Sequence, residues 1–246
     1  MTIHETAIIG QNVTIADDVN IGPFTIIHSN VEIAGNTNIG SYCELGVPNN
    51  LGKVDTTIID TDSTIRSHSI IYAGCGFGPG LTTGHRVTIR ENTYAGINFQ
   101  VGTLSDIQGD CSMGDNVRFH SNVHICKTSK IGNCVWVFPF TVLTNDPHPP
   151  SEILTGPIIE DFSIVATGSI LLPGSIVRKN SMVGAATVVK GEVPIGTICV
   201  GNPGKIVGKT SKILHKGDGK PAYPWYRHFR RGYPAGALPE IFDENF

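Results

Sequence analysis

Apolar residues recur at every sixth position along most of the chain. The pattern forms three runs, which extend from Ile3 to Leu45, from Ile59 to Leu143 and from Ile159 to Ile195. Among about thirty such positions only Thr83 is not apolar, although apolar residues make up just 40% of the chain. A period of six matches neither an α-helix nor the simple alternation of a strand. It indicates a repeating coil, because fixed internal periods are typical of solenoid folds.

A second set of inward positions lies two residues before these apolar sites and holds smaller residues. Its members include Ala7, Val13, Thr25, Cys43, Ser63, Ser69, Ser105, Ser163 and Ser175. Two inward positions separated by one residue describe a short strand, which a turn then follows. Three strands and three turns make a triangular coil of ~18 residues. The sequence therefore predicts an all-β fold, a parallel β-helix of about ten stacked coils.

The period is interrupted twice, and each interruption predicts a loop that protrudes from the helix. Residues 46–56 separate the first two runs, and residues 144–157 separate the second from the third. Protruding loops on a regular scaffold often carry function, although a tolerated surface insertion is the alternative.

The period ends near Val200, and the composition then changes. Residues 206–246 are rich in aromatic residues and proline. The prediction is a β-helix domain of residues 1–205 and an irregular C-terminal cap of residues 206–246, which covers the open end of the solenoid. The alternative is a segment that reaches a neighbouring subunit or frames a ligand.

Charge and cysteine content exclude several classes of protein. A formal net charge of −3 gives no reason to expect a nucleic-acid partner. No run of ~18 apolar residues and no secretory signal is visible, so a cytoplasmic protein without a membrane span is expected. The six cysteines form no CxxC pair, which favours reduced thiols over a zinc knuckle or a disulfide framework.

In a solenoid, residues 18 apart stack on adjacent coils, so spacing predicts contacts. Asp106 and His124 have this spacing, and both should point outward about 5 Å apart at the backbone. A carboxylate that orients an imidazole is the arrangement of a general base. His120 lies at the preceding corner, and His85 lies near that corner two coils earlier. All three histidines are therefore candidate catalytic bases.

Other polar side chains share positions on the same stretch of the cylinder. One position around the coil is shared by Glu91, Lys127 and Asn145. The next position is shared by Asn92, Asp110 and Asp146. The flat face of a single β-helix makes a poor pocket, whereas a second subunit against it would make a cleft. The cluster therefore predicts an oligomer, in particular a homotrimer with its sites between subunits.

Two segments resemble the sugar N-acetyltransferases of the hexapeptide-repeat acyltransferase superfamily, whose β-helix is left-handed. They are Phe119-His120-Ser121-Asn122-Val123-His124-Ile125 and Leu143-Thr144-Asn145-Asp146-Pro147-His148-Pro149-Pro150-Ser151. The resemblance implies that Asn145 lies at the acceptor site, together with Asn122, Asp146 and His148. The chain departs from the usual motif at Leu143, where phenylalanine is usual, and at Pro150, where arginine is common.

Further segments resemble the coenzyme A end of these enzymes. They are Val183-Gly184-Ala185-Ala186-Thr187-Val188-Val189-Lys190 and Gly201-Asn202-Pro203-Gly204-Lys205. The resemblance implies that the pantetheine arm passes small residues at Ala166, Gly168 and Ala185, and that Lys190 and Lys205 meet phosphates. Separately, Gly84-His85-Arg86-Val87-Thr88-Ile89 is similar to the catalytic segment of the lipid A acyltransferases, which implies a role for His85.

The resemblance implies an acyltransferase that uses acetyl-CoA or another acyl-CoA and needs no metal. The expected acceptor is the amino group of a nucleotide-linked sugar destined for surface polysaccharide. Alternatives are an acyl carrier protein as the donor, and a sugar or serine hydroxyl as the acceptor. A γ-type carbonic anhydrase would instead bind zinc through histidines such as His85, His120 and His124. A non-catalytic scaffold is the remaining alternative.

Overall fold

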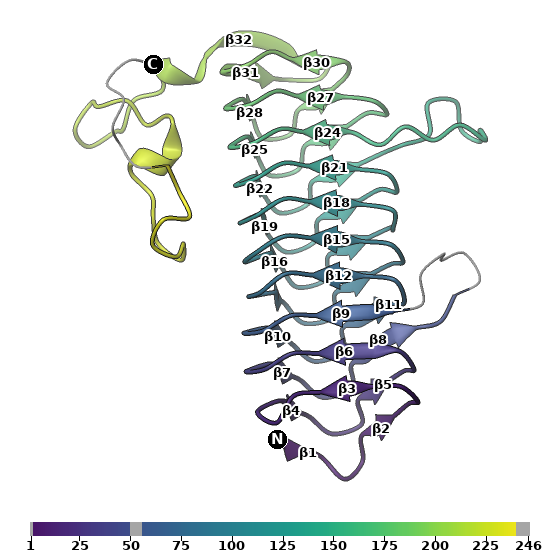
Figure 1. The fold of residues 1–246 in the computed structure, drawn as a ribbon. Helices are drawn as coiled ribbons and strands as arrows, with labels where there is room; N and C mark the ends of the chain where they lie inside the picture. Colours follow the sequence, from purple (N-terminus) through teal and green to yellow (C-terminus); the bar gives the residue numbers. More distant parts are fainter. Residues whose placement is uncertain (1, 50–55, 240–246) are drawn as a thin grey trace.

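Three parallel sheets run the length of the molecule and form the walls of a triangular solenoid (Figure 1). This computed structural model describes residues 2–49 and 56–239. We name the sheets A, B and C; in the described residues A contains twelve strands, and B and C contain ten each. Successive strands visit A, B and C in turn, so each coil contributes one strand to each sheet. The predicted parallel β-helix of about ten coils is confirmed.

Most strands contain only two residues, because each coil must turn three times. Sheet A consists of β1 (Thr2–Ile3), β4 (Asn20–Ile21), β7 (Asn38–Ile39), β10 (Thr64–Ile65), β13 (Thr82–Thr83), β16 (Gln100–Val101), β19 (Arg118–Phe119), β22 (Trp136–Val137), β25 (Ile164–Val165), β28 (Met182–Val183), β31 (Thr197–Val200) and β32 (Lys205–Lys209). Sheet B consists of β2 (Ile8–Ile9), β5 (Ile26–Ile27), β8 (Glu44–Val47), β11 (Ile70–Tyr72), β14 (Thr88–Ile89), β17 (Asp106–Ile107), β20 (His124–Ile125), β23 (Val142–Leu143), β26 (Ile170–Leu171) and β29 (Val188–Val189). Sheet C consists of β3 (Thr14–Ile15), β6 (Val31–Ile33), β9 (Thr57–Ile59), β12 (Gly76–Phe77), β15 (Tyr94–Ala95), β18 (Ser112–Met113), β21 (Lys130–Ile131), β24 (Ile158–Ile159), β27 (Ile176–Val177) and β30 (Glu192–Val193). Two short 3-10 helices, η1 (Thr210–Lys212) and η2 (Trp225–Arg227), follow.

The turns between sheets form three corners, which we call A–B, B–C and C–A after the sheets they join. Both predicted loops leave from the B–C corner. The first interrupts the chain between β8 and β9, and residues 50–55 of this loop lie outside the described residues. The second connects β23 to β24 and projects from the solenoid, as predicted (Figure 1).

The predicted inward residues build the core. The large apolar sites Ile27, Ile65 and Ile107 have no exposed surface, and the smaller sites Ser69 and Ser105 are also buried. A buried hydroxyl needs a hydrogen-bond partner, and the Ser105 Oγ donates to the backbone oxygen of His120 at 3.0 Å. Most walls of a coil therefore combine a large apolar side chain with a second buried residue, which is often a serine or threonine but is bulky at Leu81 and Phe99.

One predicted inward site is wrong. Ile195 is 69% exposed, and Val193 takes the inward position instead, where it pairs with Val177. The turn that follows Val189 is two residues shorter than the regular period, which moves the register forward. At the other end of the solenoid, Ile9 is 38% exposed because no coil lies below it.

The C-terminal extension differs from the predicted cap in its location. Only β32 lies at the end of the solenoid, where it pairs antiparallel with β31. The chain then runs back beside sheet A (Figure 1), and its aromatic residues pack on outward-facing side chains that include Trp136, Ile164 and Met182. The apolar outer face of these coils attracts the aromatic tail, whereas the narrow end of a solenoid offers little apolar area. No helix in the described residues is long and apolar enough to cross a membrane.

Truncating a core side chain is expected to destabilise the solenoid. Ile107→Ala should lower the free energy of unfolding by about 2–5 kcal/mol, because it leaves a cavity between close-packed coils. Ile58→Ala, on the outer face of β9, should change it by less than about 0.5 kcal/mol, since Ile58 is 45% exposed. Urea denaturation followed by circular dichroism measures both; equal losses would contradict the assigned core.

Candidate functional site

The predicted pair of Asp106 and His124 lies on the outer face of sheet B. Their strands, β17 and β20, are adjacent and align the two residues directly. The Nδ1 atom of His124 lies 3.1 Å from an Oδ atom of Asp106. The His124 side chain is 40% exposed, so its ring remains accessible from solvent. The arrangement holds an imidazole by one nitrogen beside a carboxylate and leaves the other nitrogen available.

Neighbouring groups keep the Asp106 carboxyl ionised. Its partial burial alone would raise its pKa, but hydrogen bonds from His124 and from Gln108, together with the charge of Arg90, outweigh burial and lower the pKa. The Gln108 Nε2 donates to the same carboxylate oxygen that faces the histidine. An ionised Asp106 favours the tautomer in which Nδ1 of His124 carries the proton.

A second group of charged residues lies beside this pair, along the B–C corner. The Glu91 side chain is 1% exposed, yet it carries a carboxylate. Arg90 donates to it from Nε at 3.0 Å and from Nη2 at 3.1 Å. The Lys127 Nζ lies 3.9 Å from Glu91 and 2.9 Å from Asp110. Two cations thus satisfy a buried carboxylate, which would otherwise be costly to bury.

The second loop is anchored to this charged group at its first turn. The Nδ2 atom of Asn145 donates to the backbone oxygen of Lys127 at 3.1 Å. On the preceding coils Asn92 donates to Asp110 at 2.8 Å. The predicted alignments of Asn145 with Lys127 and of Asn92 with Asp110 are thus direct contacts, whereas Asp146 bonds within its own loop.

The loop is also stiffened from within. The Asp146 carboxylate accepts hydrogen bonds from the Ser151 hydroxyl at 2.7 Å and from the backbone N–H groups of Ser151 and His148. The Ser151 hydroxyl contributes most to lowering the pKa of Asp146, and the two N–H groups add to it. Asp146 therefore organises the turn, while the His148 side chain remains exposed.

The structure separates the three candidate histidines. His120 lies at the A–B corner and stacks on Phe138, with ring centroids 4.6 Å apart. Its partial burial, aided by the charge of Arg118, lowers its pKa and keeps the imidazole neutral at neutral pH. His85 lies on the same corner, where its Nδ1 is 2.8 Å from the Ser67 hydroxyl. Of these three histidines, only His124 lies next to a carboxylate, that of Asp106 on the face of sheet B.

The residues expected to bind coenzyme A or the acceptor are spread over two corners. Ala166 and Gly168 lie in the turn between β25 and β26, and Ala185 lies in the corresponding turn one coil further. These turns belong to the A–B corner, as does Asn122, which adopts a left-handed φ of 59°. Lys190 follows β29 on the B–C corner. Lys205 begins β32, and the N–H of the preceding Gly204 donates to the backbone of Val188.

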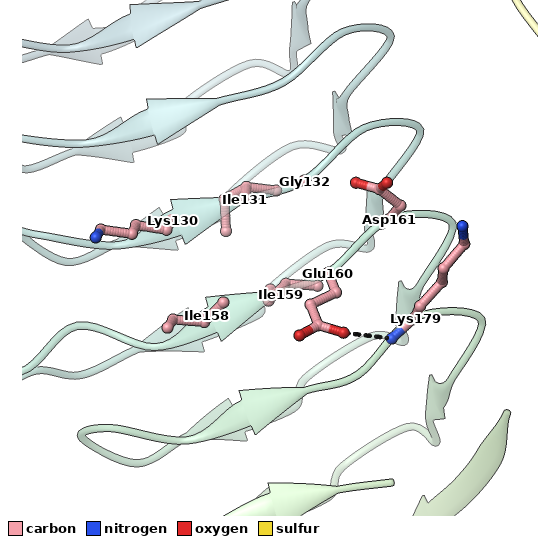
Figure 2. A pocket seen from close by; sticks show the side chains of 8 residues that line it. All are labelled: Lys130, Ile131, Gly132, Ile158, Ile159, Glu160, Asp161 and Lys179. Atoms are coloured by element: carbon pink, nitrogen blue, oxygen red, sulfur yellow. Dashed lines mark hydrogen bonds between the residues drawn. The ribbon is translucent and has the colours of Figure 1, made fainter. Parts of the chain in front are cut away.

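A separate hollow in the described surface lies on sheet C. It has a volume of about 330 Å³, and it is lined by residues that include Lys130, Ile158, Glu160 and Lys179 (Figure 2). The Glu160 carboxylate is already bound to Arg178 at 2.7 Å and to the backbone N–H of Lys179 at 3.0 Å. The Glu160 carboxylate therefore already has partners, and the hollow lies away from the pair on sheet B.

The same geometry tests whether one chain could hold zinc. In the described part of the chain, no three or more His, Cys, Asp or Glu side chains gather closely enough to bind a metal. His85, His120 and His124 each have a different neighbour, as described above. The histidines of a single chain do not fit the zinc site that a γ-type carbonic anhydrase would need.

Sequence reasoning found the pair on sheet B but did not assign roles to Arg90, Glu91, Gln108 or Lys127. A signal was present, because Glu91 and Lys127 have opposite charges and the same phase. The burial of Glu91 could not be foreseen. It depends on the space left by Gly109, which lies on the coil between Glu91 and Lys127. A side chain at Gly109 would meet the backbone oxygen of Glu91 at 2.8 Å.

Neutralising Glu91 is expected to destabilise the B–C corner. Glu91→Gln should lower the free energy of unfolding by about 1–3 kcal/mol, because it removes charge-assisted bonds from a buried site. Glu32→Gln is the matched control, since Glu32 lies exposed on β6. Urea denaturation would contradict the assigned network if both variants were as stable as the parent protein.

No protein family model matches the chain. It is 27% identical over 154 residues, 62% of its length, to the mitochondrial γ carbonic anhydrase 2 of Arabidopsis thaliana, half of which is covered. It is 33% identical over 82 residues to a 2,3,4,5-tetrahydropyridine-2,6-dicarboxylate N-acetyltransferase of Staphylococcus aureus. That match covers 33% of the chain and 34% of the relative. The chain thus spans half the length of the first relative and about a third of the second.

A solved structure reproduces the architecture over most of the chain. The UDP-N-acetylglucosamine acyltransferase from Campylobacter jejuni matches with a TM-score of 0.51 at 17% identity. The match covers 94% of this chain and 79% of that one. At this identity the similarity concerns the fold, which it supports as a left-handed β-helix.

Proposed function

We propose that the chain, which resembles the hexapeptide-repeat left-handed β-helix acyltransferases in its repeat and fold, is an acyl-CoA-dependent N-acetyltransferase. The proposed acceptor is the amino group of a nucleotide-linked amino sugar used for surface polysaccharide. The observation that carries the proposal is the contact of 3.1 Å between His124 and Asp106 on the open face of sheet B.

The proposed reaction is direct acyl transfer. His124, held by Asp106 at Nδ1, accepts a proton from the acceptor amine at Nε2. The amine nitrogen forms a bond to the thioester carbonyl carbon, and the carbon–sulfur bond of the donor breaks. His124 then returns the proton to the departing thiolate. Backbone N–H groups at a turn would stabilise the oxyanion.

The acceptor is proposed to bind between the pair on sheet B and the second loop. Lys127 and Asn145 lie at the base of this loop, next to the Glu91 carboxylate. His148, which is exposed at the tip, and Asn122 remain proposed contacts to the sugar nucleotide.

Acetyl-CoA is proposed to run along the A–B corner, where small residues leave room for a thin pantetheine arm. Gly168 supports this path, because a side chain added there would meet no atom within 4 Å. Ala166 and Ala185 occupy equivalent turns, and Lys205 is the proposed phosphate contact, whereas Lys190 lies off this path on the B–C corner. The proposal requires no metal.

A ridge of exposed side chains on the A–B corner supports assembly of the proposed homotrimer. Phe24 is 53% exposed, Tyr42 51%, Leu104 52% and Phe140 62%, and all four adopt left-handed φ values. That backbone costs roughly 1 kcal/mol for each bulky residue. An apolar ridge kept at such a cost is suited to burial against another copy of the chain.

Six buried, unpaired cysteines in the described residues support a reducing compartment such as the cytoplasm.

A substrate panel tests the proposed function. The purified protein is mixed with acetyl-CoA and each of several nucleotide-linked amino sugars, and free thiol is measured. Mass spectrometry then identifies an amide or an ester, which separates amino from hydroxyl acceptors. The same panel with acyl carrier protein tests the other donor. Thiol release that requires an amino sugar supports the proposal; release with serine or with no acceptor would overturn it.

A zinc-dependent carbonic anhydrase is the second candidate, because the γ carbonic anhydrase 2 relative matches 62% of the chain. In that case zinc would lie between subunits, since the histidines of one chain do not converge. Metal analysis of the purified protein and a carbon dioxide hydration assay decide this alternative. A protein that binds no acyl-CoA and hydrates no carbon dioxide would be a scaffold.

A further inference from the structure

A hollow with aromatic walls lies between the C-terminal extension and sheet A. Its volume is about 270 Å³, and it is lined by His120, Trp136, Phe138, Ile164, Trp225, Phe229 and Arg231. The first four belong to the solenoid, and the last three belong to the extension. The extension therefore creates the site, and the β-helix alone would present a bare face.

The solenoid wall of the hollow is a stack of rings. The His120 and Phe138 rings lie 4.6 Å apart at an angle of 19°, and Phe138 stacks on Trp136 at 6.0 Å and 25°. The Trp136 N–H already donates to the Tyr233 hydroxyl at 2.6 Å. Trp225 likewise donates to the backbone oxygen of Phe162 at 3.1 Å. Both indole N–H groups are thus already bonded, and the Arg118 guanidinium lies over the Trp136 ring, 5.0 Å from its centroid. The apolar lining left for a flat ligand comes mainly from the His120–Phe138 stack and from Trp225.

Two polar groups lie at this otherwise apolar hollow. No hydrogen bond from a described residue reaches the His120 ring nitrogens, so a neutral imidazole has a donor and an acceptor to offer. Arg231 is exposed, and its guanidinium lies 5.6 Å from the Phe229 ring centroid. No described carboxylate forms an ion pair with it.

The extension is also cationic. Residues 206–246 contain seven Lys or Arg residues against four Asp or Glu residues, a net charge of +3. The whole chain has a net charge of −3, so positive charge is concentrated here. The hollow would accept a flat ring, and its cationic rim would bind an anion. A ligand that carries both a flat ring and an anionic group would therefore fit.

We propose that this hollow binds a nucleotide, with its base against the His120–Phe138 stack and its phosphates at Arg231. The inference rests on the proposed function, since both the acyl-CoA donor and a nucleotide-linked acceptor contain such a group. Base–aromatic stacking and charge-assisted bonds to phosphate are the interactions that the site supplies. The extension then acts as a clamp on one substrate.

The tryptophans provide a direct test, because both tryptophans of the chain, Trp136 and Trp225, line the hollow. The full-length protein is titrated separately with coenzyme A, UDP, dTDP and inorganic pyrophosphate while tryptophan fluorescence is followed. Saturable quenching by coenzyme A alone identifies the donor, and quenching by UDP or dTDP alone identifies the acceptor. Pyrophosphate alone should give little quenching, since it has no ring.

Arg231→Gln should lower the affinity for whichever nucleotide quenches the fluorescence by about fivefold or more, because the substitution removes a bond to phosphate. Arg230→Gln is the matched control, since Arg230 instead donates to the backbone oxygen of Pro239. Absence of quenching by every nucleotide, or equal affinity in the parent protein and Arg231→Gln, would overturn the inference. Nucleotide quenching without acyl transfer would contradict the proposed function and leave this site standing.

Discussion

Replacing His124 by alanine is expected to lower kcat/KM for acyl transfer by about 10²–10⁴-fold, the usual contribution of a positioned general base. The acceptor amine would lose the group that removes its proton, while both substrates could still bind. The effect should therefore fall on kcat more than on KM. Steady-state thiol release from acetyl-CoA measures both constants.

His4→Ala is a suitable control, because His4 lies on the first coil, far from the pair, and its ring hydrogen-bonds to the neighbouring Thr6. It should retain activity close to that of the parent protein. Circular dichroism should show an intact β-helix in both variants, since His124 is 40% exposed and lies outside the core. Activity of His124→Ala within a few fold of the parent would contradict its role as the base.

Asp106→Asn is expected to lower kcat by about 10²-fold or more. The asparagine amide can donate to Nδ1 of His124, which moves the ring proton to Nε2 and blocks proton acceptance there. Because size and burial are preserved, KM should change little. Steady-state kinetics of Asp106→Asn measure the effect. Gln100→Asn, a change on the outer face of sheet A, is the control. Equal kcat values would contradict the orienting role of the carboxylate.

Asp106 also makes stability depend on pH. The pKa of this carboxyl lies below its usual range in the folded protein. Its contribution is therefore fully present above the unfolded pKa of about 4 and is lost as the pH falls through the folded value. Asp106→Asn should lose less stability than the parent protein between pH 7 and pH 3. Urea denaturation at several pH values measures this difference, and an equal loss would argue against the lowered pKa.

The fold could be predicted because a solenoid repeats one local solution. Each six-residue unit buries its own residues and hydrogen-bonds only to the adjacent coils, so the period alone specifies strands, turns and register. The prediction of Ile195 as an inward site was wrong, because the six-residue period is not kept in the last coil. Val193 occupies that position because the final turn is shorter, and no apolar period reveals the length of a single turn.

The pair on sheet B could be predicted for the same reason, since 18-residue spacing becomes direct pairing. The separation of His120 from His124 could be predicted only in part. Their phases place them on a corner and on a sheet, but the stacking of His120 on Phe138 depends on side-chain packing. The site of each histidine thus follows from the repeat, while its chemical surroundings do not.

The C-terminal extension could not be placed from sequence, because it has no period. Its aromatic residues are equally suited to covering the end of the solenoid or its side. The outward-facing Trp136, Ile164 and Met182 decide the outcome, since they form an apolar strip along sheet A. Arg118 completes the contact, with its guanidinium 4.1 Å from the Tyr233 ring centroid. Such a match between distant segments appears only when the chain is folded.

The most direct test of the proposed acyl transfer is thiol release from acetyl-CoA by protein that has been stripped of metal and then compared with zinc-loaded protein. Each sample is assayed with a nucleotide-linked amino sugar and, in parallel, for hydration of carbon dioxide. The proposed mechanism predicts equal thiol release in both samples and dependence on the amino sugar. Zinc-dependent hydration of carbon dioxide without thiol release would contradict it.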